Sequence, residues 1–111
     1  MAREIKESDW KLFRRFHKIT LERFCERVLR EVRSATTEHS ESYHDCYLKV
    51  FALIRDRDKI IATAFDDVSR SKAFVLLANI KQQGLLTEEE LMQFSPEARN
   101  AIEAIESIRR G

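Results

Sequence analysis

Glycine and proline, the residues that interrupt helices, occur only three times in this 111-residue chain, at positions 84, 96 and 111. Strand-rich folds need turn residues at short intervals, whereas a long run without them favours helices. Hydrophobic residues make up 43% of the chain and the net charge is only +1, a composition that forms a core and is unlike that of a disordered chain. The sequence therefore predicts a single all-α domain over residues 1–111.

A long helical hairpin is expected in the first two thirds of the chain. Apolar residues recur at three- and four-residue spacings over about 9–33 and about 42–68, and the small polar stretch 34–42 separates the two segments as a loop. Ser42 and Asp45 resemble a capping box at the start of the second helix.

The second long helix carries a seam whose steps alternate between four and three residues, the heptad rhythm of helices that pack lengthwise. The seam consists of Tyr43, Tyr47, Val50, Ile54, Arg57, Ile61, Ala64 and Val68. Additional apolar residues beside it make the stripe wider than a two-stranded coiled coil needs, which favours a helical bundle. Because a buried arginine needs a carboxylate, we expect Arg57 to form a cross-helix or cross-chain salt bridge, with Asp66, Asp67 or an acidic residue of the first helix.

Three shorter helices are expected to complete the bundle, over about 72–83, 88–94 and 96–109. Gly84 is placed to end the first of them in the left-handed conformation. Thr87 and Glu90 form a capping box for the second. Ser95 followed by Pro96 is a typical start for the third.

The lengths of the two long helices bear on assembly. Unbroken helices of about 26 residues would extend ~39 Å, whereas a compact chain of this length is roughly 35 Å across. Either the first helix breaks near residues 17–20, where Thr20 could cap a second segment, or a partner chain covers the overhang. We favour a homodimer, because two-fold dimers are the commonest assembly.

Positive charge is concentrated near the start of the chain. Residues 1–33 contain ten Lys or Arg against six acidic residues. Lys11, Arg14, Arg15 and Lys18 form a basic run without an acidic residue between them. With Arg57 they are the candidate interaction surface, and the run is the best candidate for binding a phosphate, a nucleic acid or an acidic partner. A nearly neutral chain is nevertheless unlike a dedicated nucleic-acid binder.

Glu41 and His44 are the candidate metal ligands, because Glu and His three residues apart on a helix can face one ion. The pair occurs once, and di-metal bundles need four carboxylates and two histidines. Cys25 and Cys46 lie in apolar helical patterns typical of small buried residues. The sequence has neither a glycine-rich phosphate loop nor a catalytic constellation, so we expect no enzyme activity and no cofactor.

Residues 1–16 are charged throughout, so we expect no signal peptide, and the longest apolar run, residues 73–78, is too short to cross a bilayer. We therefore expect a cytoplasmic protein with no membrane association.

Residues 74–94 resemble the bacterial short C-terminal oligomerisation domain. That family has a leucine-rich helix, a glycine, an Ile or Leu pair, and then Thr-Glu-Glu-Glu before a hydrophobic residue. The matching positions are Leu76, Leu77, Ile80, Gly84, Leu85, Leu86, Thr87, Glu88, Glu89, Glu90 and Leu91. Ser95-Pro96 departs from the pattern, since the second helix of the family continues there. The resemblance implies a helical hairpin used in self-association.

Three functions remain open from the sequence. The first is protein–protein interaction or self-association without catalysis. The second is nucleic-acid or phosphate binding through the basic run on the first helix. The third is metal binding at Glu41 and His44.

Overall fold

The structure, a computed structural model, describes residues 4–111, and every regular element in that range is helical. The elements are α1 (Glu7–Thr37), α2 (Tyr43–Ala64), the short 3-10 helix η1 (Arg70–Lys72), α3 (Ala73–Gln82), α4 (Glu88–Leu91) and α5 (Pro96–Arg110). The predicted all-α fold, with a long hairpin followed by three shorter helices, is confirmed.

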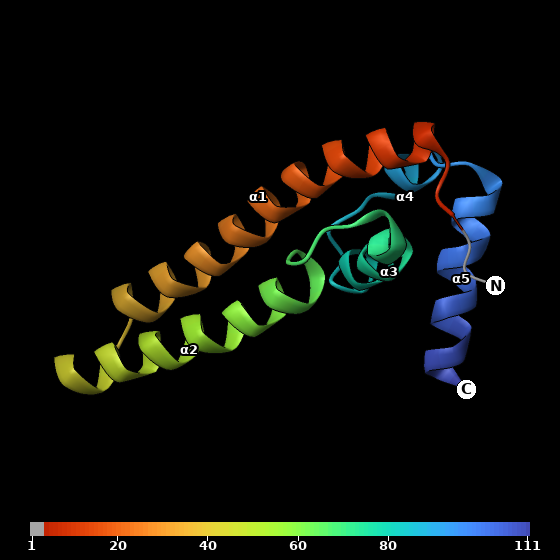
Figure 1. The fold of residues 1–111 in the computed structure, drawn as a ribbon. Helices are drawn as coiled ribbons and strands as arrows, with labels where there is room; N and C mark the ends of the chain where they lie inside the picture. Colours follow the sequence, from red (N-terminus) through yellow and green to blue (C-terminus); the bar gives the residue numbers. More distant parts are fainter. Residues whose placement is uncertain (1–3) are drawn as a thin grey trace.

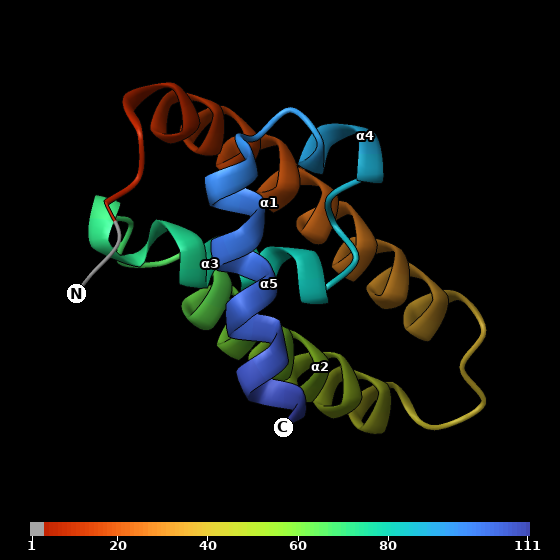
Figure 2. The same ribbon diagram turned by 90° about the vertical axis from the view of Figure 1, so that its right-hand side faces the viewer.

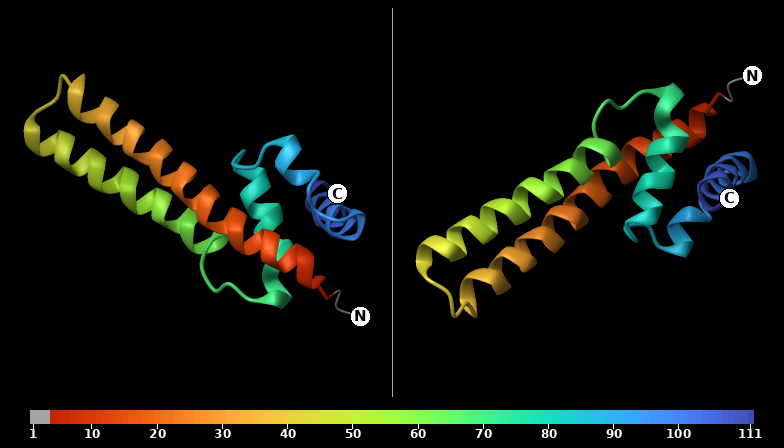
Figure 3. Two further views of the ribbon diagram at one scale, coloured as in Figure 1. Left: turned by 90° about the horizontal axis from the view of Figure 1, so that it is seen from above. Right: turned by 90° about the horizontal axis from the view of Figure 1, so that it is seen from below.

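Helices α1 and α2 run antiparallel, and α3, α4 and α5 gather at one end of this hairpin (Figure 1). Figure 2 shows α5 lying across α3 when the molecule is viewed from that end. The other end of the hairpin extends as two helices alone, as both views of Figure 3 show. The molecule measures 54 × 26 × 22 Å, so the hairpin extends beyond the roughly 35 Å of a compact chain of this length.

The hydrophobic core lies where α3 meets the first half of α1 and the start of α5. Helix α3 is apolar on nearly all sides, which suits a central helix. Fully or almost fully buried side chains from these elements form one cluster: Phe13, Phe16, Phe24, Leu76, Leu77, Ile80, Phe94, Ala98 and Ile102. Several of its aromatic rings are in contact, including Phe16 with Phe94 at 6.0 Å between centroids.

The first helix does not break near residues 17–20. The Thr20 hydroxyl donates to the carbonyl of Phe16 at 2.6 Å, so it bonds back within one continuous helix instead of capping a new one. His17 explains the polar interruption of the apolar pattern, because its Nε2 contacts the carbonyl of Phe65 at 2.8 Å beyond the end of α2. The polar stretch is therefore a junction between helices.

The boundaries of the two long helices differ from the prediction at the C-terminal end of each helix. Helix α1 continues to Thr37, so residues 34–37 are helical. Ser42 caps α2 as expected, and its hydroxyl accepts from the Asp45 amide at 3.1 Å. Helix α2 ends at Ala64, four residues earlier than predicted, and Asp67 then takes a positive φ of 57° in the turn that leads to η1.

The predicted turn signals around residues 84–96 are present. Gly84 has a φ of 71° and follows α3, and the Leu85 amide donates back to the Ile80 carbonyl. Thr87 and Glu90 form the reciprocal capping box of α4, which ends at Leu91 instead of residue 94. Ser95 caps α5 with Pro96 in its first turn.

Two polar contacts attach α1 to this turn region. Asp9 is buried and accepts from the Ser95 amide at 2.9 Å and from the Ser95 hydroxyl. The Arg23 guanidinium donates to both carboxylate oxygens of Glu90, at 2.6 and 2.7 Å, and to the Leu85 carbonyl at 2.8 Å. Glu90 thus serves both as a helix cap and as a tertiary contact.

Candidate functional site

The hairpin has two parts that differ in burial. We call residues 25–63 the arm and the remaining described residues, 4–24 and 64–111, the body. Within the arm Cys46 is the single buried residue, although the arm is long and rich in apolar side chains. The arm is the part that projects from α3, α4 and α5 in Figure 3. Two helices that touch along one line leave most of their surface in solvent.

The seam of α2 that packs against α1 differs from the one predicted. The buried and partly buried residues of α2 are Cys46, Val50, Leu53, Arg57, Ile60, Ile61 and Ala64. All of these except Ile61 follow steps that alternate between four and three, so they form an inner seam with the same heptad rhythm. The predicted seam shares Val50, Arg57 and Ala64 with the inner seam. Its Ile61 is partly buried beside them, and its Val68 lies beyond the end of α2.

Three other residues of the predicted seam, Tyr43, Tyr47 and Ile54, form an exposed apolar stripe with Phe51, which we call the outer seam. Tyr43 and Tyr47 are 87% and 65% exposed, and Ile54 is also exposed. Phe51, 54% exposed, follows Tyr47 by four residues and therefore lies on the same side of α2. Single exposed apolar residues are common on protein surfaces, but an aligned series of aromatic and aliphatic side chains is typical of an interaction surface.

Arg57 lies on the inner seam and joins the two helices of the arm. Its Nε and Nη2 donate to the two carboxylate oxygens of Glu31 in α1, at 3.2 and 2.7 Å, and its Nη1 also contacts Asp56. The Arg57 guanidinium lowers the pKa of Glu31. The expected cross-helix salt bridge is therefore present within the chain, with an acidic residue of the first helix as its partner.

The basic run lies on α1 in the body. Lys11, Arg14, Arg15 and Lys18 are all exposed. Arg15 bonds Gln93 at 3.4 Å and lies over the Phe16 ring. Across residues 4–111, the other three have no carboxylate within ion-pair distance. Helical spacing of three and four places these three on one solvent face.

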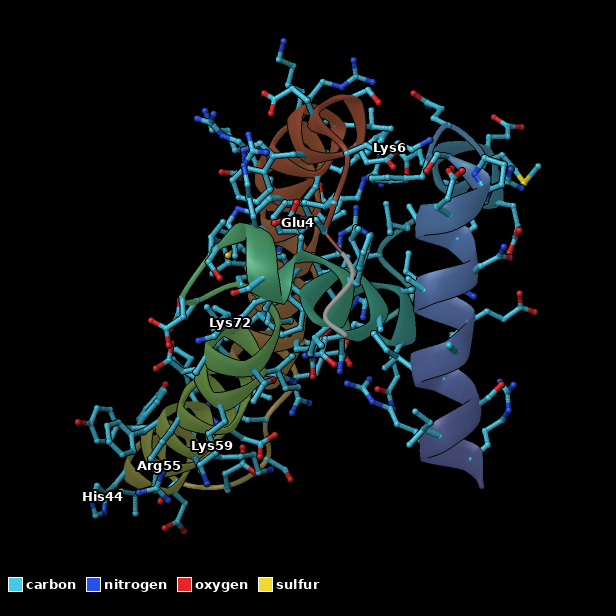
Figure 4. The ribbon with its side chains drawn as sticks, turned by 45° about the vertical axis from the view of Figure 1, so that its right-hand side comes forward. Glu4, Lys6, His44, Arg55, Lys59 and Lys72 are labelled. Carbon is cyan, nitrogen blue, oxygen red and sulfur yellow. The ribbon has the colours of Figure 1, made fainter. Side chains whose placement is uncertain are left out.

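The candidate metal ligands Glu41 and His44 do not belong to one group of three potential ligands among residues 4–111. Glu41 precedes the N-cap of α2, so the helical spacing that would align it with His44 does not apply. His44 is exposed and stacks on Tyr47, and Figure 4 shows it on the arm, away from α5. The residues that do meet Glu41 are His39 and Cys46.

No protein-family model matches the chain, and no curated protein or solved structure matches it either. Across residues 4–111, each helix is too short or too polar to cross a membrane.

Some of these features had a signal in the sequence and others had none. The outer seam was visible as a heptad pattern, but the pattern could not say whether its partner lies within the chain or outside it. The contact of Arg23 with Glu90 joins residues 67 positions apart, and neither position stands out in the sequence. His39 lies in the loop between α1 and α2, where residue spacing gives no information about its neighbours.

Proposed function

We propose that this chain is a small cytoplasmic protein that acts by binding, without catalysis, and that it forms a homodimer through its arm. The observation that supports this best is the outer seam, a stripe of large apolar side chains that remain mostly exposed to solvent in the described residues. Two free thiols, Cys25 and Cys46, suit a reducing compartment.

A second copy fits this face in size. Within the arm, α2 contributes residues 43–63, about 32 Å of helix, and α1 contributes residues 25–37, about 20 Å. At a width of about 10 Å per helix, one face of the arm has a projected area of roughly 510 Å², about two thirds of the ~800 Å² that each partner contributes to a stable interface. Two arms packed face to face would form a four-helix bundle, an arrangement in which amphipathic helices bury their apolar faces in a shared core.

The charges of the arm also suit a second copy. Along α2 the segment 55–59 alternates in sign, with Arg55, Asp56, Arg57, Asp58 and Lys59 in succession. When an antiparallel copy packs against it, positive and negative side chains of one copy face a mixture of positive and negative side chains of the other. Like-charge repulsion therefore does not oppose association. A surface of this kind gives less attraction to nucleic acid than a uniformly basic face does.

The apolar residues that carry the resemblance to an oligomerisation domain lie elsewhere. Leu76, Leu77, Ile80, Leu85 and Leu91 are buried in the core of the chain itself. We therefore assign self-association to the arm and not to the segment 74–94.

Sedimentation equilibrium of the purified chain tests the dimer. We expect a reversible dimer with a micromolar or tighter Kd, and a weakening of at least ~10-fold, or 1.4 kcal/mol, in the double variant Tyr47→Ala, Ile54→Ala. Met92→Ala is the matched control, because Met92 is an exposed apolar residue of the body. A wild-type chain that stays monomeric at high micromolar concentration would overturn the proposal, as would equal weakening by Met92→Ala.

The basic run supports a second candidate function, the binding of a nucleic acid or another polyphosphate. Its favouring observation is the exposed face of Lys11, Arg14 and Lys18, which lacks ion-pair partners among residues 4–111. Binding to mixed-sequence nucleic acid should then weaken steeply with salt and be lost in a triple alanine variant. The absence of binding at low salt would eliminate this candidate while leaving the dimer unaffected.

A further inference from the structure

The turn between α1 and α2 brings three potential metal ligands together. One ring nitrogen of His39, one carboxylate oxygen of Glu41 and the Sγ of Cys46 all lie within 4.8 Å of one another. His39 and Glu41 are partly buried and Cys46 is buried. These are the three side-chain types that bind zinc and similar ions in proteins.

A second observation at the same place concerns the Glu41 carboxylate. Its Oε2 accepts from Lys49 at 2.9 Å, but its Oε1 is buried without a hydrogen-bond partner among residues 4–111. The Nδ1 of His39 is 3.7 Å from Oε1, too far for a hydrogen bond, and it already contacts the Glu41 backbone carbonyl at 2.9 Å. Because a buried oxygen without a partner is costly, it points to a cation that would complete its coordination.

We propose that His39, Glu41 and Cys46 bind a divalent transition metal ion, with Zn²⁺ as the best match. A thiolate and an imidazole are the ligands that Zn²⁺ prefers, whereas Ca²⁺ and Mg²⁺ take oxygen ligands. Three protein ligands leave one position of a four-coordinate ion for water or a further ligand.

The local structure holds two of these groups in place before any ion arrives. The carbonyl contact orients the His39 ring beside Glu41. Cys46 lies in the first turn of α2, where Ser42 caps the helix, and its thiol contacts the Ala35 carbonyl of α1 at 3.4 Å. An ion bound here would join the residues after α1 to the first turn of α2, closing the free end of the arm.

Binding is also a proton exchange. The Cys46 thiol loses its proton to solvent as the sulfur–metal bond forms, so one proton is released for each ion bound through sulfur and the affinity rises with pH. The oxidation state of the metal and of the sulfur does not change.

The test uses the full chain without a polyhistidine tag, stripped of metal by a chelator, and titrated with Zn²⁺ alone by calorimetry. We expect one ion per chain, and an observed binding enthalpy that varies linearly with the ionisation enthalpy of the buffer, with a slope that gives the number of protons exchanged on binding. Co²⁺ used as a spectroscopic probe should give a thiolate-to-metal charge-transfer band. Cys46→Ser should abolish that band, and His39→Gln and Glu41→Gln should each weaken Zn²⁺ binding at least ~10-fold.

The chain contains its own matched controls. Cys25→Ser and His44→Gln change the same residue types outside the cluster and should leave Zn²⁺ affinity and the Co²⁺ band unchanged. If Cys46→Ser proves unstable, His39→Gln is compared with the controls instead. The His39 side chain lies in the loop, where a substitution disturbs the helices less. The proposal is overturned if the wild-type chain fails to bind Zn²⁺ at micromolar concentration, or if a control variant weakens binding as much as His39→Gln does. Sedimentation equilibrium of the metal-free chain measures dimerisation without Zn²⁺, so the test of metal binding and the test of the dimer give separate results.

Discussion

The body and the arm belong to one chain and share one helix, yet they are built differently. The body surrounds α3 with Phe13, Phe16, Phe24 and Phe94 and fixes its turns with polar contacts. The arm places comparable apolar residues on two helices and buries only Cys46. The body thus has the contacts of a self-contained fold, whereas the apolar surface of the arm is available for binding.

Two phenylalanines provide the strongest test of this difference. Phe24 in the body is 1% exposed, whereas Phe51 in the arm is 54% exposed. Phe24→Ala should lower the free energy of unfolding by about 3–5 kcal/mol, because it empties a packed site. Phe51→Ala should change the stability of the monomer by less than ~0.5 kcal/mol.

Urea unfolding gives the free energy of unfolding of each variant, and repeating it at several protein concentrations separates the stability of the monomer from any effect of association. If Phe51→Ala proves as costly as Phe24→Ala in dilute, monomeric protein, the arm has a core of its own and the distinction is lost.

The acid dependence of stability should come in part from the body, through Glu90. Hydrogen bonds from Arg23, followed by those from Thr87, lower the pKa of Glu90 from 4.5 to about 2. A carboxyl with a lowered folded-state pKa contributes stability above pH 4.5, and this is lost as the pH falls toward 2. Since Arg23 is partly exposed and screened, we expect a contribution of about 2 kcal/mol, less than the full pKa shift would imply.

Unfolding free energies of wild type and Glu90→Gln between pH 6 and about pH 2.5 check this. The difference between the two proteins should shrink on acidification. A difference that stays constant with pH would mean that the charge of Glu90 is not what stabilises the turn.

Gly84 tests the turn that connects α3 to α4 in the body. A Cβ at this position would meet nothing within 4 Å, so only the backbone opposes a side chain. With φ at 71°, Gly84→Ala should cost about 1 kcal/mol. Gly84→Asn should cost less, because Asn adopts the left-handed conformation more readily. Thermal unfolding of the two variants should reveal this order, and equal losses would argue against backbone strain.

The smallest expected effect is in the arm, at the ion pair of Arg57 with Glu31. Both side chains are partly exposed, so Arg57→Ala should cost about 0.5–1 kcal/mol. A double-mutant cycle with Glu31→Gln isolates the pair, and its coupling should decrease in high salt. Coupling that does not change with salt would mean that the ion pair is more shielded from solvent than it is in the monomer.

The parts of the fold that were predicted from sequence are those whose signals are local. Ser42, Gly84, Thr87 and Ser95 each act on backbone groups within a few residues, so their residue types and spacings were sufficient. The long helices followed from periodicity and from the lack of glycine and proline. The end of the first long helix was less exact, because Ser34 to Thr37 are small and polar and resemble a loop in composition.

The features that were missed depend on contacts between residues distant in sequence. The residue type of Thr20 suits a helix cap, but its hydroxyl donates to the carbonyl of Phe16 within a continuous α1. The heptad pattern of α2 gave the rhythm of packing correctly, but two adjacent seams share that rhythm and differ by a small rotation. The choice between them depends on α1, which the pattern of α2 does not describe. The proximity of His39 to Cys46 likewise depends on the path of the loop between α1 and α2, which residue spacing does not predict.

The continuity of α1 has a consequence for how the arm forms. Starting a helix is unfavourable, whereas extending one adds a hydrogen bond for each residue that is fixed. The body stabilises residues 7–24 of α1, so residues 25–37 only extend a helix that already exists. Helix α2 follows a loop and lacks such a start at Tyr43, so its first turns depend on the Ser42 cap and on contacts with α1. Fraying should therefore begin at the start of α2, where Tyr43 and Tyr47 are exposed, and a second copy bound there would suppress it.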